Sequence, residues 1–391
     1  MNHTMQRAFL QARHFLKAEP VLSAAALLSL LTAVRVPPSR AWLDYPDLRV
    51  LALLLCLMLT VEGLRSTGLF LYAGKKLLGR VTGTLGLTLV LTGLCFFFSM
   101  LITNDVALLT FVPFSVSTLT MAGKRHLLVP VIVLQTAAAN LGSMLTPVGN
   151  PQNLFLYSYF NIPAGKMILV MLPLTLLSLL LLLGWAGLVA CRERSRGAAD
   201  APGEASLDGA FSNEKMNSRD LFLYGLMAGF CLLCVARVIS WEIMLAAVVL
   251  LTLGTDRTLF LRIDWLLLLT FVFFFIFIGN LQAIPQVGAL LRGMLAEHTL
   301  AACILGSQII SNVPAAVLFS GFTTDVVSLL YGVNVGGLGT LIASLASVIS
   351  FRIYAGEKGA DLKEYFLYFT LVNVVFLAVL WAAAGLLQIL Y

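Results

Sequence analysis

Charged side chains are scarce in this 391-residue sequence. Asp, Glu, Lys and Arg make up 11% of it, against about 25% in ordinary soluble domains, and 60% of the residues are hydrophobic. Several apolar stretches approach or exceed the roughly 20 residues that a membrane helix needs. The composition excludes an ordinary soluble protein and predicts an all-α polytopic membrane protein. The net charge of +6 comes from groups between the apolar stretches, so it indicates membrane topology and no nucleic-acid partner.

The residue groupings that serve enzymes and pumps are also missing from the sequence. The four histidines form no cluster, and the apolar stretches contain neither an acidic cluster nor a Gly-x-Ser-x-Gly motif. No Gly-Lys-Ser/Thr motif is found, so we do not expect ATP-driven pumping by this chain. Most of the six cysteines stand within apolar runs, which predicts no disulfide framework. We therefore expect no enzyme activity, no cofactor, and no bound metal beyond a possible sodium ion.

A polar segment divides the sequence into two halves. Residues 191–220 are rich in Gly, Ala, Ser and charge, which predicts a flexible cytoplasmic linker between an N-terminal half, 1–190, and a C-terminal half, 221–391. Each half contains an unusual apolar stretch, 82–122 and 299–324, preceded by an amphipathic piece at 64–79 and 283–297. Other helices are expected near 21–35, 48–63, 127–141 with 150–161, 165–190, 221–238, 241–254, 264–280, 334–351 and 364–390.

The distribution of basic residues predicts the orientation of the chain. If each unusual stretch begins and ends on the same side, a cytoplasmic N-terminus leaves 19 of the 25 Lys and Arg residues inside and 6 outside. Such an excess of inner basic residues is typical of membrane proteins. The prediction is a multi-pass protein of the plasma or inner cell membrane. Its C-terminus then lies outside after nine crossings.

Polar residues interrupt both unusual stretches. Thr103, Asn104 and Asp105 stand in the first, and Ser311 and Asn312 stand in the second. Each arm of the second stretch has about a dozen residues, or roughly 18–20 Å at 1.5 Å per residue, too short to cross about 30 Å of hydrocarbon. This predicts a re-entrant hairpin with its tip near mid-membrane. The first stretch fits such a hairpin, but it equally fits two full helices joined by an outer turn at 103–105.

The two halves share a pattern of motifs. Residues 103–114 align with 311–322, and residues 142–155 align with 336–349; these alignments match Asn104 with Asn312, Thr146 with Thr340, Asn150 with Ser344 and Asn153 with Ser347. Each half thus has a polar tip followed by a glycine-rich break in a later helix. The predicted orientation makes them two inverted-topology repeats, each with a re-entrant helical hairpin and an interrupted transmembrane helix, as in many secondary transporters.

The polar tips and the helix breaks are typical of sites that bind ions. A helix that begins in hydrocarbon has unpaired N–H groups, which residues 103–105 and 311–312 are expected to cap. The positive ends of two such helices favour an anionic ligand. Gly142, Pro147 and Gly149 interrupt one helix, and unwound carbonyls with Asn and Thr side chains suit a sodium ion. Asp105 is a candidate for coupling transport to a cation or a proton. Burying a carboxylate in the membrane without compensation costs at least a few kcal/mol, so a carboxylate found there is a functional candidate.

The motifs TND, GSMLTPVGNPQN, SNVP and GGLGT resemble those of the ion transporter superfamily over nearly the whole chain. That group includes divalent anion–sodium symporters, citrate carriers, arsenite permeases and some sodium/proton antiporters. The resemblance implies secondary active transport of a small anion or oxyanion, coupled to sodium or protons by an elevator-type movement, usually in a homodimer. It implies substrate binding by Thr103, Asn104, Thr146, Asn150, Asn153, Ser311, Asn312, Thr340 and Ser344, and cation coupling by Asn104, Asp105, Gly149, Asn312 and Gly339.

Alternatives remain at this point. The tips differ from the Ser-Asn-Thr tips of the carboxylate carriers and look more like those of the arsenite-permease and antiporter branch. A cation/proton antiporter that uses Asp105 is therefore the second hypothesis, and the sequence does not forbid a channel. Two ion pairs, Glu62 with Arg65 and Arg237 with Glu242, are expected at helix boundaries.

Overall fold

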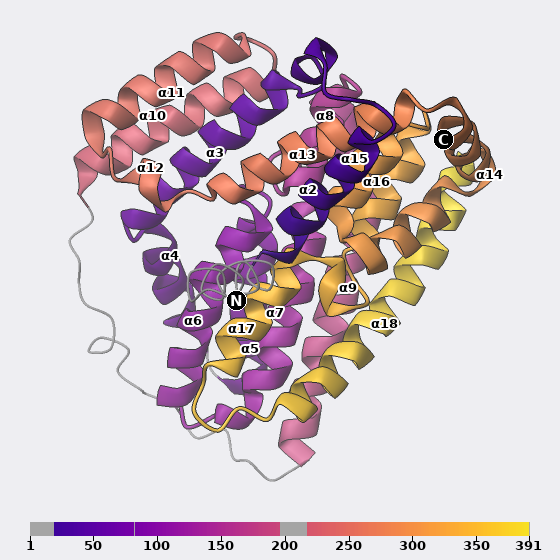
Figure 1. Ribbon diagram of the computed structural model, residues 1–391. Helices are drawn as coiled ribbons and strands as arrows, with labels where there is room; N and C mark the ends of the chain where they lie inside the picture. The colour runs from indigo at the N-terminus through magenta and orange to yellow at the C-terminus, as the bar shows by residue number, and fades with distance from the viewer. Residues whose placement is uncertain (1–18, 82, 196–216, 391) are drawn as a thin grey trace, which may run out of the picture.

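The computed structural model describes residues 19–81, 83–195 and 217–390, where all regular structure is helical (Figure 1). The helices are α2 (Pro20–Ala33), α3 (Leu48–Ser66), α4 (Leu69–Leu78), α5 (Gly83–Phe98), α6 (Asn104–Met121), α7 (Leu128–Ser143), α8 (Pro151–Tyr159), α9 (Ala164–Ser195), α10 (Ser218–Val235), α11 (Trp241–Thr255), α12 (Leu259–Arg262), α13 (Trp265–Gln282), α14 (Pro285–Ile310), α15 (Asn312–Ser320), α16 (Val326–Val335), α17 (Leu345–Ala355) and α18 (Leu362–Leu387). Short 3-10 turns occur at Arg40–Leu43, Arg125–Leu127, Leu341–Ala343 and Gln388–Leu390.

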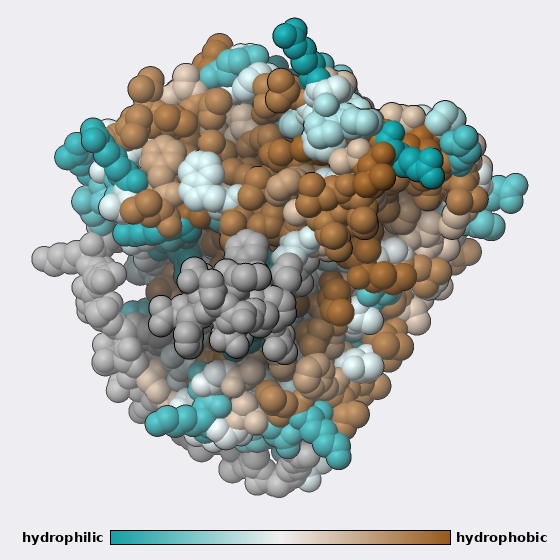
Figure 2. All heavy atoms as spheres, in the orientation of Figure 1, coloured by the Kyte–Doolittle hydropathy of each residue, from teal (hydrophilic) through white to brown (hydrophobic). Residues whose placement is uncertain are grey.

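The outer surface is that of a membrane protein. Six helices of the described part are long and apolar enough to cross a bilayer. Large apolar side chains stand exposed on them, among them Leu180 on α9 and Leu367 on α18, each 64% exposed. Figure 2 shows hydrophobic residues over much of the visible face, with hydrophilic residues gathered toward its margins. The expected all-α polytopic membrane fold is confirmed.

Helix α7 lies in the centre of the molecule. In the apolar segment Arg125–Ser143, 89% of the residues are buried, against 28–39% in the other candidate spans. It packs against α5, α6, α9, α17 and α18, so it has neighbours from both halves of the chain. Because α7 leads into the first glycine-rich break, this core position fixes the break inside the protein.

The two halves make matching contacts with each other. Helix α2 of the first half packs against α13 of the second, and α11 of the second packs against α3 of the first. Likewise α6 packs against α17, and α15 packs against α8. These pairings are the ones expected if α6 corresponds to α15 and α8 to α17, as the sequence alignment predicts. They support the repeat, while its inverted orientation in a membrane remains a prediction.

Some helix boundaries differ from the prediction. The bounds of the helix expected at 334–351 are wrong, although the break predicted in it is present: α16 begins at Val326, no α-helix covers 336–344, where Leu341–Ala343 form a 3-10 turn, and α17 continues to Ala355. Asp325 explains the early start, because its Oδ1 accepts a hydrogen bond from the Ser328 N–H at 3.0 Å. The division expected between 283–297 and 299–324 is confirmed, because the backbone of His298 inside α14 is non-helical (φ −132°, ψ 25°) and kinks the chain at that point. Most of the linker predicted at 191–220 lies outside the described residues.

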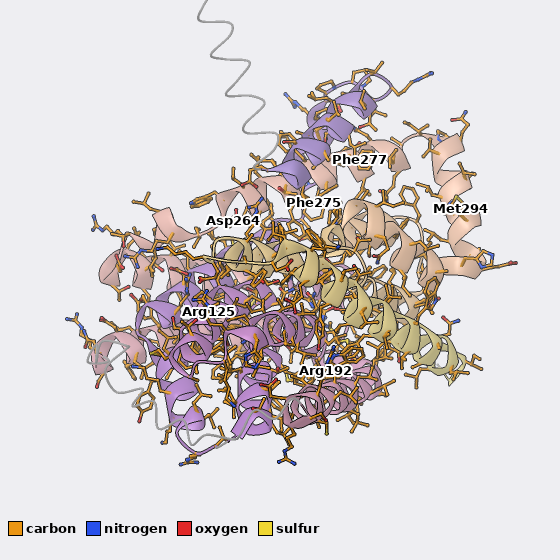
Figure 3. All side chains as sticks on the ribbon, turned by 90° about the horizontal axis from the view of Figure 1, so that it is seen from below. Arg125, Arg192, Asp264, Phe275, Phe277 and Met294 are labelled. Atoms are coloured by element: carbon orange, nitrogen blue, oxygen red, sulfur yellow. The ribbon has the colours of Figure 1, made fainter. Side chains whose placement is uncertain are left out.

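Basic residues from both halves meet at one end of the molecule. Arg125, which precedes α7, donates a hydrogen bond to the Lys358 carbonyl oxygen at 2.9 Å. Figure 3 looks onto this end, where Arg125 and Arg192 are labelled. Both arginines belong to the group that the sequence assigns to the cytoplasm. The basic residues nearest the N-terminus, Arg7, Arg13 and Lys17, lie outside the described residues, and the orientation of the termini remains a prediction.

Candidate functional site

The two polar tips lie inside the protein. Asn104 and Asn312 are only 4% and 3% exposed. The Asn104 N–H donates to the Gly149 carbonyl oxygen at 3.0 Å, which attaches the first tip to the first break. Helix α15, which follows the second tip, has only nine residues, about 14 Å, and is too short to cross a bilayer. An open turn at 103–105 does not fit the burial of Asn104, so this geometry favours the hairpin alternative for residues 82–122; residue 82 itself is not described.

Asn140 on α7 links the first tip to the second break. Its Oδ1 accepts hydrogen bonds from Asn104 Nδ2 at 3.1 Å and from Ser344 Oγ at 2.9 Å. Its Nδ2 donates to the Gly337 carbonyl oxygen at 3.4 Å. A methyl group added to Gly337 would lie 2.8 Å from Asn312 Nδ2, so the second tip touches the same residue. Both tips therefore meet around Asn140 and Gly337.

Asn334 on α16 holds the equivalent place in the other half. Its Oδ1 accepts from Asn150 Nδ2 at 3.1 Å, and its Nδ2 donates to Asn153 Oδ1 at 2.7 Å. In the sequence alignment Asn334 corresponds to Asn140, and Asn150 corresponds to Ser344. Each half thus extends an asparagine from the helix before its break to the residue that begins the helix after the other break. Neither asparagine was among the predicted site residues, although the alignment of 142–155 with 336–349 pairs them when it is extended by two residues.

The outer parts of the two breaks also match. Thr146 Oγ1 donates to the Met100 carbonyl oxygen at 2.6 Å, and Thr340 Oγ1 donates to the Gln308 carbonyl oxygen at 3.3 Å. Met100 and Gln308 each stand three residues before their tip. Both threonines thus fasten a break to a hairpin arm. Thr340 is exposed, and its recorded hydrogen bonds go to Gln308 and not to the central asparagines.

The expected capping by the tip side chains is wrong. Thr103 precedes α6 and Ser311 precedes α15, but neither side chain accepts a hydrogen bond from its helix. Ser311 Oγ instead donates to the Ala343 carbonyl oxygen at 3.4 Å. The first turns of both helices are therefore not closed by a side chain of the tip. This leaves their positive ends directed at the centre of the protein.

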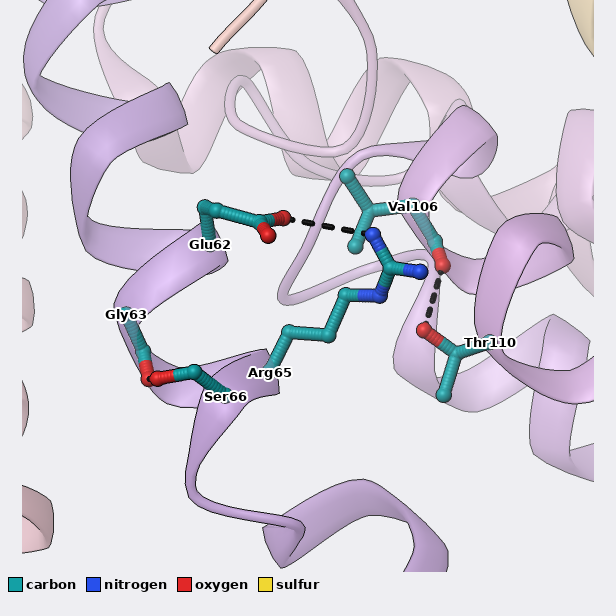
Figure 4. Close-up of polar contacts among 6 residues, drawn as sticks. All are labelled: Glu62, Gly63, Arg65, Ser66, Val106 and Thr110. Atoms are coloured by element: carbon teal, nitrogen blue, oxygen red, sulfur yellow. Dashed lines mark hydrogen bonds and ion pairs between the residues drawn. The ribbon is translucent and has the colours of Figure 1, made fainter. Parts of the chain in front are cut away.

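A cavity of about 170 Å³ reaches the first tip. Apolar residues of α3 and α6 form much of its wall; its polar lining residues are Glu62, Arg65, Thr103, Asp105, Asn150, Arg262 and Asp264. Glu62 and Arg65 form the expected ion pair, at 3.3 Å. Figure 4 shows the Arg65 side chain extending from α3 toward α6. The carboxylate atom Oδ1 of Asp105 is buried without a hydrogen-bond partner. Arg65 and Arg262, which the sequence assigns to the cytoplasm, are among the residues that line the cavity.

A second contact joins the halves at the C-terminal end of α8. The Tyr157 hydroxyl donates to the Val235 carbonyl oxygen, and Arg237 Nη2 donates to the Ile162 carbonyl oxygen at 2.7 Å. The Arg237 guanidinium also lies over the Tyr157 ring, 5.2 Å from its centroid. The predicted pair with Glu242 is wrong, because within the described residues these two groups form no ion pair.

The site offers oxygen and amide groups, and no metal cluster. Within the described residues, no group of three or more His, Cys, Asp and Glu side chains could hold a metal ion. The cysteines of this part are free, and all but Cys191 are buried. Amide, hydroxyl and carbonyl oxygens are the donors that suit an alkali-metal ion. This donor set is compatible with the possible sodium ion and with a small polar solute.

Known proteins resemble this chain over most of its length. Residues 15–328 match the citrate transporter family. An uncharacterised transporter of Methanocaldococcus jannaschii is 32% identical over 307 residues, which cover 77% of this chain and 79% of that protein. The Escherichia coli inner membrane protein YbiR is 31% identical over 324 residues, 80% and 82% of the two chains. The rice silicon efflux transporter LSI3 is 31% identical over a shorter region, 39% of this chain and 30% of that protein.

Proposed function

Because this chain belongs to the citrate transporter family and is a multi-pass membrane transporter, we propose that it moves a small anion or oxyanion by secondary active transport. The solute binds between the two hairpin tips, and a sodium ion or a proton is the coupling ion. The single observation that carries the proposal is the convergence of the buried tips Asn104 and Asn312 around Asn140 and Gly337, beside a cavity that reaches Thr103 and Asp105.

The chemistry of the tips explains the preference for an anion. Helices α6 and α15 point their uncapped N-termini toward the centre, where each contributes about half a positive charge. No Lys or Arg is among the hydrogen-bond partners recorded for the central asparagines in the described part of the chain. Binding therefore depends on amides, hydroxyls and helix ends. The silicon named for the rice relative is carried in water as an oxyacid, which favours an oxyanion or oxyacid over a carboxylate.

The movement that we propose is an elevator-type displacement. A unit containing both hairpins and both interrupted helices slides against a scaffold that includes α2, α3, α11 and α13. The pairing of α2 with α13 and of α3 with α11 supports this division. We further propose a homodimer in the plasma or inner membrane, with a cytoplasmic N-terminus and an outer C-terminus.

Uptake by reconstituted vesicles tests the function. The purified protein is assayed with citrate and other carboxylates, sulfate, phosphate, arsenite and silicic acid, each under an imposed sodium or proton gradient. We expect accumulation of at least one of these solutes that depends on one of the gradients. Conductance in single-channel recordings, or no gradient-driven flux of any solute, would contradict the proposal.

A cation/proton antiporter is the second candidate, and Asp105 is the observation that favours it. Its buried Oδ1 has no hydrogen-bond partner and its side chain lines the cavity, so the carboxylate is available to a cation or a proton. The variant Asp105→Asn separates the two functions. For an anion carrier we expect solute transport to continue with a changed pH dependence, because the amide retains the shape of the tip. Complete loss of sodium-driven proton movement, with no solute flux in the parent, would favour the antiporter.

A further inference from the structure

The two equivalent halves of the site differ in how completely their polar groups are paired. On the side of Asn334, the side-chain oxygen and nitrogen atoms of the asparagines all have hydrogen-bond partners. Asn153 Nδ2 donates to the carbonyl oxygens of Met144 and Thr146 at 2.9 and 3.1 Å, and its Oδ1 accepts from Asn334. Asn150 Oδ1 accepts from the Asn153 N–H at 2.9 Å, which caps α8. This side forms a closed hydrogen-bond network.

The side of Asn140 leaves oxygen atoms without partners. Asn140 Oδ1 accepts from Asn104 Nδ2 and from Ser344 Oγ, so the Asn104 amide must turn its oxygen away from Asn140. That oxygen is buried and has no hydrogen-bond partner. Ser347 corresponds to Asn153 in the other half, and its hydroxyl is also buried without a partner, on a residue that is 0% exposed. A buried unpaired polar group costs about 1–3 kcal/mol, so a ligand that pairs with it is stabilised.

The helix ends differ in the same direction. Ser344 precedes α17 as Asn150 precedes α8, but Ser344 donates its hydroxyl to Asn140 and does not cap its helix. Helix α6 has no side-chain cap either and packs against α17, whereas on the opposite side the uncapped α15 packs against the capped α8. The side with the unpaired oxygens therefore has two uncapped helix starts, and the opposite side has one. The cavity also borders this side, because Thr103, Asp105 and Leu345 line it, next in sequence to Asn104 and two residues from Ser347; Asn150 of the opposite network lines it as well.

We infer that the ligand site is one-sided: it is formed by Asn104 and Ser347 at the starts of α6 and α17, with Asn140 as the residue that positions Asn104. The inference rests on the proposed transport function. On the opposite side, the paired side chains of Asn153 and Asn334 maintain the fold, and Asn150 reaches the cavity with its amide nitrogen and oxygen already engaged by protein partners. Asn140 and Ser347 thereby join the candidate site; the sequence alignment matched Ser347 with Asn153, but neither Asn140 nor Ser347 was among the predicted site residues.

The chemistry of the unpaired atoms restricts the ligand. Asn104 Oδ1 can only accept, and Asp105 Oδ1 accepts when it is ionised, so the ligand must present a hydrogen-bond donor, such as an O–H group, or a cation to them. The uncapped helix starts favour negative charge elsewhere on the ligand. An oxyanion or acid that keeps at least one hydroxyl group satisfies both requirements. A sodium ion satisfies the first alone, and the experiment separates these two sources.

Replacing the unpaired hydroxyl provides the sharpest test. Ser347→Ala removes an atom that has no protein partner, so the unfolding temperature of the ligand-free protein should stay the same or rise slightly. The KM for the solute identified in the uptake panel should increase about three- to tenfold, the loss of one hydrogen bond. Ser158→Ala is the matched control, because that buried hydroxyl on α8 also lacks a partner but stands at the end of the helix away from the break.

Adding sodium and the solute separately shows which of the two binds the Ser347 hydroxyl. The unfolding temperature of the purified parent and Ser347→Ala proteins is measured in sodium chloride and in choline chloride, with and without the solute. A weaker solute response in both salts assigns the hydroxyl to the solute, and a weaker sodium response in the absence of solute assigns it to the cation. Either result supports the site. Unchanged responses to both, in a protein that transports, would overturn the inference and leave the proposed function intact.

Two further variants test the one-sidedness and the positioning role. Gln152 on α8 also has an unpaired buried oxygen, Oε1, close in sequence to the saturated network. Gln152→Met should leave the KM unchanged; an increase equal to that of Ser347→Ala would disprove the one-sided site.

Asn140→Asp keeps the acceptor for Asn104 and Ser344, so it should recover more affinity than Asn140→Ala. Equal KM values in these two variants would contradict the positioning role. Absence of any flux or ligand response in the parent would contradict both proposals.

Discussion

Gly337 is the residue at which the second tip, the second break and Asn140 come closest together. Its carbonyl oxygen accepts from Asn140, and a Cβ atom at this position would lie 2.8 Å from Asn312 Nδ2. No side chain fits there without displacing the asparagine. The site therefore depends on the absence of a side chain as much as on the polar groups around it.

Gly337→Ala should accordingly impair transport more than folding. The added methyl group displaces the flexible Asn312 side chain, so we expect at least a tenfold loss of uptake by a protein that still reaches the membrane. Gly184→Ala in α9 is the control, because a Cβ there meets nothing within 4 Å. That variant should retain uptake and gain about 0.5–1 kcal/mol of helix stability. Normal uptake by Gly337→Ala would contradict this close contact.

Sequence reasoning found the tips more readily than the residues that join them. Asn104, Asp105 and Asn312 stood out because polar groups are rare in apolar stretches. Asn140 and Asn334 lie within helices, two residues before the glycines that the alignment used, and nothing local distinguishes them from packing residues. Their role comes from long-range contacts, which the sequence of one segment does not contain.

The start of α15 is the most strained of the helix ends. Ser311 has φ +74° and ψ 155°, a conformation that is essentially restricted to glycine and costs about 1–3 kcal/mol for other residues. Its hydroxyl donates to the Ala343 carbonyl oxygen, which offsets part of that cost. The strain allows α14 to end and α15 to begin with a single residue between them.

Ser311→Gly should raise the thermal stability of the ligand-free protein, by about 1 kcal/mol, because glycine adopts this conformation freely. Ser311→Ala should lower stability instead, since it keeps the strain and loses the hydrogen bond. Thermal unfolding of the two variants in detergent measures the difference. If both variants melted at the same temperature, the backbone strain at Ser311 would make no measurable contribution to stability.

At the level of helices, the sequence predicted which helices and breaks exist better than it predicted where each helix begins and ends. The break at 144–150 was located within two residues, because Pro147, Gly149 and Pro151 cannot continue a helix. The second break was placed inside a helix expected at 334–351, since glycines alone are weaker signals than prolines. The Asp325 cap that starts α16 was not recognised. The division at His298 was located correctly, because an amphipathic pattern gives way to an apolar one at this residue, where the backbone of α14 is non-helical.

Considered as a whole, the molecule has a cavity lined by Arg65 and Arg262 and a separate contact between its halves at Tyr157 and Arg237. The contacts of Tyr157 with Val235 and of Arg237 with Ile162 connect α8 to the turn between α10 and α11. Any movement of the interrupted helices against the α10–α11 pair must break them. They therefore stabilise the conformation whose cavity faces the arginine side.

Tyr157→Phe should shift the protein away from this conformation. The test follows thiol labelling of Val106→Cys, which lines the cavity, in a Cys191→Ser background. We expect slower labelling from the cavity side in Tyr157→Phe, because the far contact opens more often. Tyr159→Phe, a partly exposed residue on the same helix, is the control and should label at the parent rate. Identical labelling rates in all three proteins would show that the contact does not control the opening.

The burial of α7 has a consequence for how this protein can change over generations. A substitution on a helix that is enclosed by the protein must fit its packed neighbours, whereas exposed residues of α9 and α18 such as Leu180 and Leu367 have few neighbours in the described part of the chain. Random mutations should accumulate freely on those outer helices and be eliminated along α7. New substrate preferences would then arise by altering the residues that α7 supports, with α7 itself nearly constant.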